Sequence, residues 1–248
     1  MDSAIKKYTY HRSIGYIFTL IVHICNMIYL RTTVRAVVEK EWDDKRVKSF
    51  SELQGRYFTG WTVVVQILHA ITGLMCELLI LWNFKKKNYQ LPSYLRGFRN
   101  TLYCGVLWPS TMLVSSMFWS LYSYDRGLIF PEFVDKILTV TTNHILHSLI
   151  VPIALWELWY QPRVKPRSHK KYIGHMTFHM LLYLSVLLYT YTTKGVWIYP
   201  VFKTLQGTIY FPLIFISITI FLFIAYYIQW LFVWMVWGNF EKKGKKSK

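Results

Sequence analysis

Residues 137–160 read ILTVTTNHILHSLIVPIALWELWY, which is long and apolar enough to cross a lipid bilayer as a helix. The stretch nevertheless carries Asn143, His144, His147 and Glu157. Hydrocarbon cannot hydrogen-bond these groups, so such residues normally face a protein interior and often mark function. Because residues three or four apart share a helical face, the first three form a compact polar cluster that points in one direction. The sequence thus predicts a membrane helix that carries a polar site.

The composition places the chain among the membrane proteins. Apolar residues make up 54% of its 248 residues, and they fall into blocks of about 20, the length that spans a bilayer. A soluble protein would distribute them in amphipathic periods instead. The net charge of +17 does not indicate nucleic-acid binding, because Lys and Arg lie in short loops flanking the apolar blocks. We therefore expect an all-α, polytopic membrane bundle that contacts lipid and no nucleic acid.

Six apolar blocks predict six transmembrane helices within one membrane domain, residues 14–237. A polar N-terminus (1–13) precedes this domain, and a basic tail (238–248) follows it. Pro109 predicts a kink in the third span, because proline removes a backbone donor. The predicted spans are residues 13–30, 57–82, 101–122, 137–160, 172–193 and 209–237.

The second predicted span carries its polar and small residues at successive gaps of three or four. Such spacing draws one narrow stripe along a helix, and in a membrane helix that stripe turns toward neighbouring helices. We expect these residues to face the interior of the bundle: Thr59, Thr62, Gln66, His69, Gly73 and Glu77.

The basic residues predict the orientation of the chain, since six spans place both termini on one side. The N-terminus, loops 83–100 and 161–171, and the tail hold 3, 5, 5 and 5 Lys or Arg, against 7, 2 and 2 in the opposite loops. The positive-inside rule then places both termini in the cytoplasm. The seven basic residues of loop 31–56 are the one departure from this pattern.

The chain ends in Lys245-Lys246-Ser247-Lys248. This ending resembles a dilysine retrieval signal on a cytosolic tail, and it is equally typical of a basic tail attracted to anionic lipid. The expected location is therefore either the endoplasmic reticulum or the plasma membrane.

One chemistry that the polar groups allow is nucleophilic attack. A threonine hydroxyl becomes a nucleophile when a neighbouring base takes its proton, and a neutral histidine suits that role. Thr59 and His147 lie on polar faces of two different spans, so they can meet across the bundle. Threonines in membrane helices more often bond their own backbone carbonyls, which is the alternative for Thr59.

The paired histidines would instead allow the chain to bind a metal ion or a haem. His144 and His147, and likewise His175 and His179, place two imidazoles on one helical face. A haem held by two histidines would need them on separate helices at matched depth, and His69, His147 and His179 leave that option open.

A third possibility is a cluster of carboxylates and histidines inside the membrane. Glu77, Glu157, His175 and His179 all fall toward the cytoplasmic ends of their spans, where we expect them to form one ion-paired cluster. Such a cluster serves either as structural support or as part of a proton or ion path.

Three motifs resemble those of one known family: LYSYDRGLIFP (121–131), NHILH (143–147) and KGVWIYP (194–200). Over residues 14–237 the chain is similar to the androgen-induced and androgen-dependent TFPI-regulating proteins. These are multi-pass intramembrane threonine hydrolases that cleave fatty acid esters of hydroxy fatty acids. The resemblance implies the same activity on an ester that enters from the bilayer, and we expect no cofactor and no metal.

The catalytic pair of that family is a threonine early in the second span and the last histidine of the N-H-x-x-H motif. The matching residues are Thr59, in YFTGWTVVVQ, and His147, with Thr62 as the rival if the register slips by three. Two straight helices that start at Tyr57 and Ile137 would place Thr59 and His147 at depths differing by about 12 Å.

Other residues are expected to support this site. Asn143 lies one turn before His147 and could orient it, whereas His144 is offset and fits a packing or supporting role. Four residues of the short non-cytoplasmic loops are expected to shape the mouth or hold a fatty carboxylate: Asp125, Arg126, Trp197 and Tyr199. A packed Asp–Arg pair within the loop is the alternative for the first two.

Two other functions are open. A non-enzymatic transporter or signalling scaffold would depend on Glu77 and Glu157 and not on Thr59. A haem or metal redox protein would keep its colour or its metal through purification.

Overall fold

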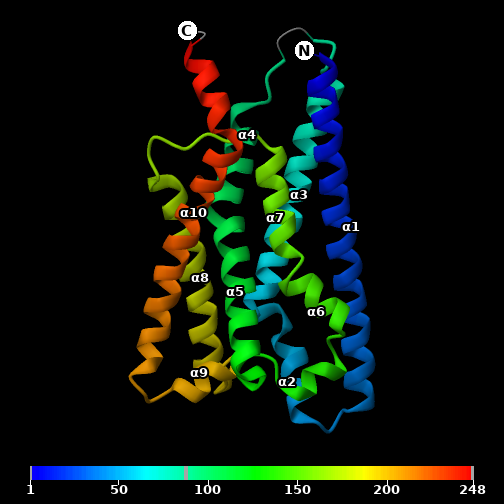
Figure 1. Cartoon of the computed structure of the whole chain (residues 1–248). Helices are drawn as coiled ribbons and strands as arrows, with labels where there is room; N and C mark the ends of the chain where they lie inside the picture. The colour runs from blue at the N-terminus through cyan, green and yellow to red at the C-terminus, as the bar shows by residue number, and fades with distance from the viewer. Residues whose placement is uncertain (1, 87–88, 247–248) are drawn as a thin grey trace.

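The computed structural model describes residues 2–86 and 89–246, and the side chains of residues 8–86 and 89–238. Its long helices stand side by side in one bundle (Figure 1), and these described ranges contain no strand. The predicted all-α class is therefore confirmed. The α-helices are α1 (Asp2–Lys40), α2 (Lys45–Leu53), α3 (Phe58–Trp82), α4 (Ser93–Leu102), α5 (Trp108–Asp125), α6 (Val140–His147), α7 (Ile150–Tyr160), α8 (Lys170–Lys194), α9 (Pro200–Leu205) and α10 (Tyr210–Lys246).

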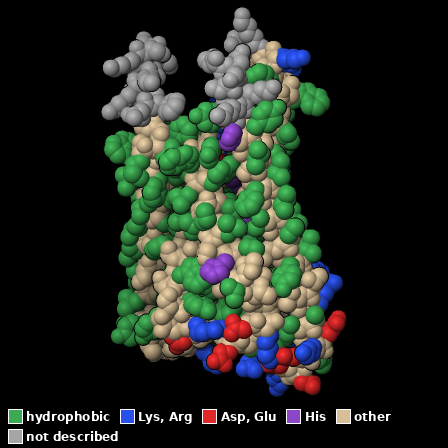
Figure 2. Space-filling view, turned by 45° about the vertical axis from the view of Figure 1, so that its right-hand side comes forward, with side chains coloured by type: hydrophobic (Ala, Val, Ile, Leu, Met, Phe, Trp, Pro, Cys, Tyr) green, Lys and Arg blue, Asp and Glu red, His purple; other side chains and the backbone are tan. Residues whose placement is uncertain are grey.

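The long helices are consistent with an integral membrane protein. In the described part of the chain, four segments are long and apolar enough to cross a membrane: α1, α2 with α3, α8 and α10. The pairs α4–α5 and α6–α7 run between the same two ends of the bundle (Figure 1), but each is interrupted. Figure 2 shows hydrophobic side chains over the middle of one face and charged ones at the end formed by α2 and α9. The number of six spans stays a prediction.

Several predicted boundaries differ from the observed helix ends. The boundaries at residues 13 and 237 fall inside α1 and α10. Most of the predicted loop 31–56 is helical, because α1 continues to Lys40 and α2 follows it. Asp44 caps α2 by accepting a hydrogen bond from the Arg46 N–H at 2.9 Å. The last residues of the dilysine-like ending, 247–248, lie outside the described residues.

Prolines interrupt two of the predicted spans. Pro109 has no N–H for the carbonyl of Gly105, and a π-helical turn, η2 (Tyr103–Leu107), lies immediately before it. The prediction of one helix over 137–160 is wrong, because Pro152 has no N–H for the carbonyl of Ser148. The helix therefore breaks after His147, and α6 runs obliquely to α7 (Figure 1).

The polar stripe of α3 faces the interior, as predicted, and most of its members are buried. Gln66 joins three helices: its Oε1 lies 2.7 Å from Nε2 of His23 in α1, and its Nε2 donates to the Ile150 carbonyl of α7 at 2.9 Å. Gly73 allows α1 to approach closely, because a Cβ at this position would overlap the ring of Tyr16. The stripe thus fixes how α3 packs.

The two buried glutamates pair with arginines. Glu77 accepts hydrogen bonds from Arg12 at 2.7 Å and from Arg99 at 3.1 Å. Glu157 accepts one from Arg163 at 2.7 Å. A guanidinium group stays charged and presents several donors in one plane, so it satisfies a buried carboxylate better than imidazole does. The Glu77 pairs connect α1, α3 and α4, whereas the Glu157 pair joins α7 to the segment that follows it.

The prediction that His175 and His179 pair with these glutamates is therefore wrong. His175 is exposed and bonds the carbonyl of Lys171 in its own helix at 2.7 Å. The ring of His179 packs 5.6 Å from that of Phe58. The histidine near a carboxylate is His69, whose Nε2 lies 3.6 Å from Glu157.

Replacing Glu77 by Gln is expected to lower the free energy of unfolding by about 3–5 kcal/mol, because two buried arginines lose their counter-charge. Denaturation of the purified protein in detergent measures this change. Glu52→Gln is the matched control, since Glu52 pairs with Lys194 at 3.3 Å on an exposed surface and is expected to contribute at most about 1 kcal/mol. Equal stability of the two variants would contradict a structural role for the buried pairs.

Candidate active site

Thr59 lies in the first turn of α3, two residues after the N-cap residue Tyr57. Side chains on a helix tilt toward its N-terminus, so the Thr59 hydroxyl points back toward the start of α3. The short helix η1 (Gln54–Arg56) connects α2 to this point. Thr59 is half-buried there, at the wall of a cavity.

His147, the last residue of α6, is the hydrogen-bond partner of Thr59. Its Nε2 lies 3.3 Å from the Thr59 Oγ1. Its Nδ1 lies 2.7 Å from the side-chain oxygen of Asn143 and 3.1 Å from the backbone carbonyl of the same residue. Because a backbone carbonyl can only accept, Nδ1 carries the proton, and Nε2 presents its lone pair to the threonine hydroxyl.

Phe118 of α5 fixes the plane of this imidazole. The two rings stack with centroids 3.6 Å apart and an angle of 9° between their planes. His147 is buried, so the stacking ring and Asn143 together leave one edge of the imidazole facing Thr59. A hydroxyl group, an imidazole and a side-chain amide therefore stand in one hydrogen-bonded series.

The break between α6 and α7 brings Thr59 and His147 to the same depth. A straight helix from Ile137 would have left them about 12 Å apart in depth, whereas α6 begins at Val140 and runs obliquely to α7. Thr62, the rival nucleophile, is buried and donates to its own Phe58 carbonyl at 3.0 Å. The structure thus brings Thr59, and not Thr62, to the histidine.

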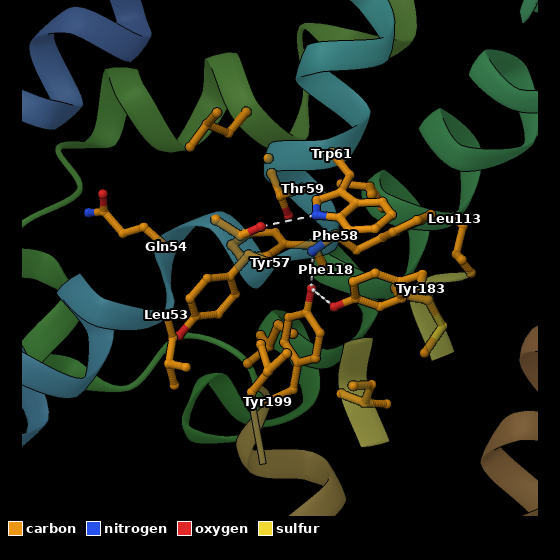
Figure 3. Close-up of a pocket in the computed structure, with 18 of the residues that line it drawn as sticks. Leu53, Gln54, Tyr57, Phe58, Thr59, Trp61, Leu113, Phe118, Tyr183 and Tyr199 are labelled. Carbon is orange, nitrogen blue, oxygen red and sulfur yellow. Dashed lines mark hydrogen bonds between the residues drawn. The ribbon is translucent and has the colours of Figure 1, made fainter. Parts of the chain in front are cut away.

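A cavity of about 1460 Å³ adjoins the pair. It is larger than the roughly 300–1,000 Å³ of pockets that hold drug-sized ligands. Its walls come from α1, α2, α3, α5, α6, α8, α9 and α10 and are mostly aliphatic and aromatic, as Figure 3 shows for Leu53, Phe58, Leu113 and Phe118. A cavity of this size and lining can accommodate a long apolar molecule.

Two of the four loop residues predicted for the mouth line this cavity. The Tyr199 hydroxyl accepts a hydrogen bond from the Phe58 N–H at 2.9 Å and lies 3.3 Å from the Tyr183 hydroxyl (Figure 3). Burial raises the pKa of Tyr199, so its phenol stays protonated. Trp197 lines the cavity and stacks on Tyr191 with ring centroids 4.2 Å apart.

The other two loop residues do not line it. Asp125 accepts a hydrogen bond from the Gly127 N–H at 2.8 Å and closes the end of α5. Arg126 pairs with Asp135 at 2.7 Å, so the expected Asp125–Arg126 pair does not form. His144 is exposed, stacks on a tryptophan and also lies away from the cavity.

Phe118, Tyr183 and His179 belong to the surroundings of the site but were not predicted from the sequence. Phe118 and Tyr183 lie in apolar blocks, where an aromatic residue that supports a site has no spacing to distinguish it from core packing. His179 belongs to a histidine pair of the sequence, yet it lies in the cavity wall, where it packs on Phe58.

The histidines are not arranged as metal ligands. Within the ranges that the structure describes, no three His, Cys, Asp or Glu residues come together in a way that could hold a metal ion. Both ring nitrogens of His147 are engaged by Thr59 and Asn143. The chemistry available here is that of a hydroxyl group activated by a base.

Comparison with known proteins gives several relatives. Androgen-dependent TFPI-regulating protein of Homo sapiens is 34% identical over 113 residues, 46% of this chain and 49% of that protein. The protein of the same name in Rattus norvegicus is 28% identical over 166 residues, 66% and 70% of the two chains. Androgen-induced gene 1 protein of Homo sapiens is 26% identical over 106 residues, 43% and 44%.

The chain spans about half the length of the human relatives that it matches. No solved structure matches it. The model of the family described as FAR-17a/AIG1-like protein matches residues 14–232. This match extends from α1 to α10, so the resemblance inferred from the three sequence motifs is confirmed, and the chain belongs to the FAR-17a/AIG1-like family.

Proposed function

We propose that this protein is an integral membrane hydrolase that cleaves fatty acid esters of hydroxy fatty acids. The observation that carries the proposal is the hydrogen-bonded series Thr59–His147–Asn143 at the wall of a large apolar cavity. Nucleophile, general base and orienting group in this order are the arrangement that covalent ester hydrolysis requires. The substrate class comes from the motif resemblance and fits the size and lining of the cavity.

The reaction has two halves. Thr59 Oγ1 attacks the ester carbonyl carbon while His147 Nε2 takes its proton. The C–O bond to the hydroxy fatty acid then breaks, and its oxygen receives the proton from His147. In the second half, His147 takes a proton from water, the hydroxide attacks the acyl-threonine, and the fatty acid leaves as Thr59 regains its proton.

Backbone groups at the start of α3 are the donors we assign to the developing oxyanion. Because the helix begins at Phe58, the N–H groups of Thr59 and Gly60 have no acceptor inside it, while Tyr199 occupies that of Phe58. The positive end of the helix dipole also favours negative charge at this position.

The ester would enter sideways from the lipid, and its acyl chains would lie among the aliphatic and aromatic side chains of the cavity. We place both termini in the cytoplasm on the distribution of basic residues. The membrane is that of the endoplasmic reticulum or the plasma membrane.

Thr59→Ala and His147→Ala are each expected to lower kcat for a branched fatty acid ester by about 10²–10⁴-fold, because each removes one participant in proton transfer and attack. Hydrolysis by the purified protein in detergent measures this. Thr62→Ala is the control, since its hydroxyl bonds the backbone of its own helix. Unchanged turnover in both of the first variants would overturn the mechanism.

Asn143→Ala is expected to lower kcat about ten- to a hundredfold with little change in KM, because His147 keeps only a backbone acceptor for its Nδ1 proton and loses part of its orientation. Steady-state kinetics of the variant beside wild type test this expectation. A rise in KM with kcat intact would show instead that Asn143 contacts the substrate.

An activated phosphonate that traps serine- and threonine-type nucleophiles is expected to label one residue covalently. Mass spectrometry of the labelled peptide should identify Thr59, and labelling should disappear in Thr59→Ala while persisting in Thr62→Ala. Label on Thr62 would reassign the nucleophile.

A further inference from the structure

The cavity has an excess of positive charge that ester hydrolysis alone does not explain. Four cationic residues line it, and no Asp or Glu of the described residues does; the four are Arg31, Arg35, Lys45 and Arg46. Arg46 is neutralised, because its Nη2 lies 2.9 Å from an oxygen of Asp44. The hydrogen bond from Arg46 lowers the pKa of Asp44 to about 2, so this carboxylate stays ionised. The other three cations of the lining, Arg31, Arg35 and Lys45, have no such acidic partner among the described residues.

Arg31 and Arg35 lie one turn apart near the end of α1. They share a face with Met27, Leu30 and Val34, which also line the cavity, so this face of α1 forms one wall of it. Both arginines are exposed, and within the described ranges neither side chain forms a hydrogen bond or an ion pair. Their guanidinium groups are therefore available to a ligand.

Among the nearby acids, Glu39 and Asp43 do not line the cavity. Glu41 and Glu52 already have partners. Glu41 pairs with Lys136 at 2.8 Å, and Glu52 pairs with Lys194 at 3.3 Å. These contacts leave the arginines of α1 as cations at the rim of an apolar cavity. They also belong to loop 31–56, the one segment whose positive charge departs from the membrane-orientation pattern. A ligand-binding role accounts for that departure.

We propose that Arg31 and Arg35, assisted by Lys45, form a carboxylate-binding site at the cavity rim that holds the free carboxylate of the ester substrate. This proposal rests on the proposed function and extends it. A fatty acid ester of a hydroxy fatty acid carries one carboxylate in addition to its ester group. Guanidinium groups bind carboxylates through two parallel hydrogen bonds, which orient the ligand as well as attract it.

The consequence is selectivity for acids over neutral lipids. With the carboxylate at the rim and the acyl chain in the cavity, the ester carbonyl is directed toward Thr59. A methyl ester of the same molecule, or a triacylglycerol, lacks the group that the arginines hold. The site thus distinguishes a branched fatty acid from the neutral esters that surround it in the membrane.

Kinetics with two substrates test this site. In Arg31→Gln/Arg35→Gln, KM for the free-acid ester is expected to rise about tenfold, with KM and kcat for its methyl ester unchanged. Lys40→Gln is the control, because Lys40 is exposed on the same helix but does not line the cavity. Equal changes for both substrates, or no change for either, would overturn the proposal.

Binding to Thr59→Ala protein separates this proposal from the hydrolase itself, since no turnover is needed. A fluorescent fatty acid should bind about tenfold more weakly when the two arginines are also replaced, while a fatty alcohol of equal length binds the same. Competition by phosphatidylglycerol, which is anionic through its phosphate alone, tests the other source of anions in the micelle. Displacement of the fatty acid from Thr59→Ala protein by that phospholipid would identify a headgroup site and refute the carboxylate site.

Discussion

A polar group inside an apolar bundle has no water to bond, and α3 carries such groups along its whole length. Thr62 bonds the backbone of its own helix, but the larger polar groups find partners on neighbouring helices, and these partners determine which helices surround α3. Glu77 draws in arginines from α1 and α4, and Gln66 joins α1 to α7. At the other end of the same face, Thr59 meets His147 of α6. One requirement, the pairing of buried polar groups, organises both the packing and the candidate site.

The polar groups at the two ends of this stripe differ in how many of their hydrogen-bonding positions have partners. Glu77 has a cationic partner for each of its oxygens and is fully buried, which makes it a structural element. Thr59 has one partner, a histidine whose other nitrogen is already engaged, and it borders open space. A group that is polar, partly free and next to a cavity is available for chemistry. A transporter or scaffold built on the glutamates would need them to be less tightly paired.

Irregular helix geometry is what assembles the candidate site. A continuous helix over residues 137–160 would have carried His147 past Thr59, whereas the break before Pro152 lets α6 run obliquely to α7 and end at it. Phe118 then stacks on the imidazole, and the cavity adjoins the pair. The rim of that cavity differs from its walls, because it carries cations from the end of α1 and the start of α2.

The sequence by itself determined the all-α membrane class, the inward stripe of α3 and the family, because these depend on composition, on spacing along one helix and on short ordered motifs. It also identified Thr59 and His147 as candidates, but it could not bring them together. Only the tertiary structure decided that Thr62 bonds its own backbone, that Arg126 pairs with Asp135, and that Arg31 and Arg35 face the cavity. Each of these outcomes depends on where a helix ends and what packs beside it. The meeting of Thr59 with His147, and of α1 with the other cavity walls, requires contacts between distant segments, which no local spacing specifies.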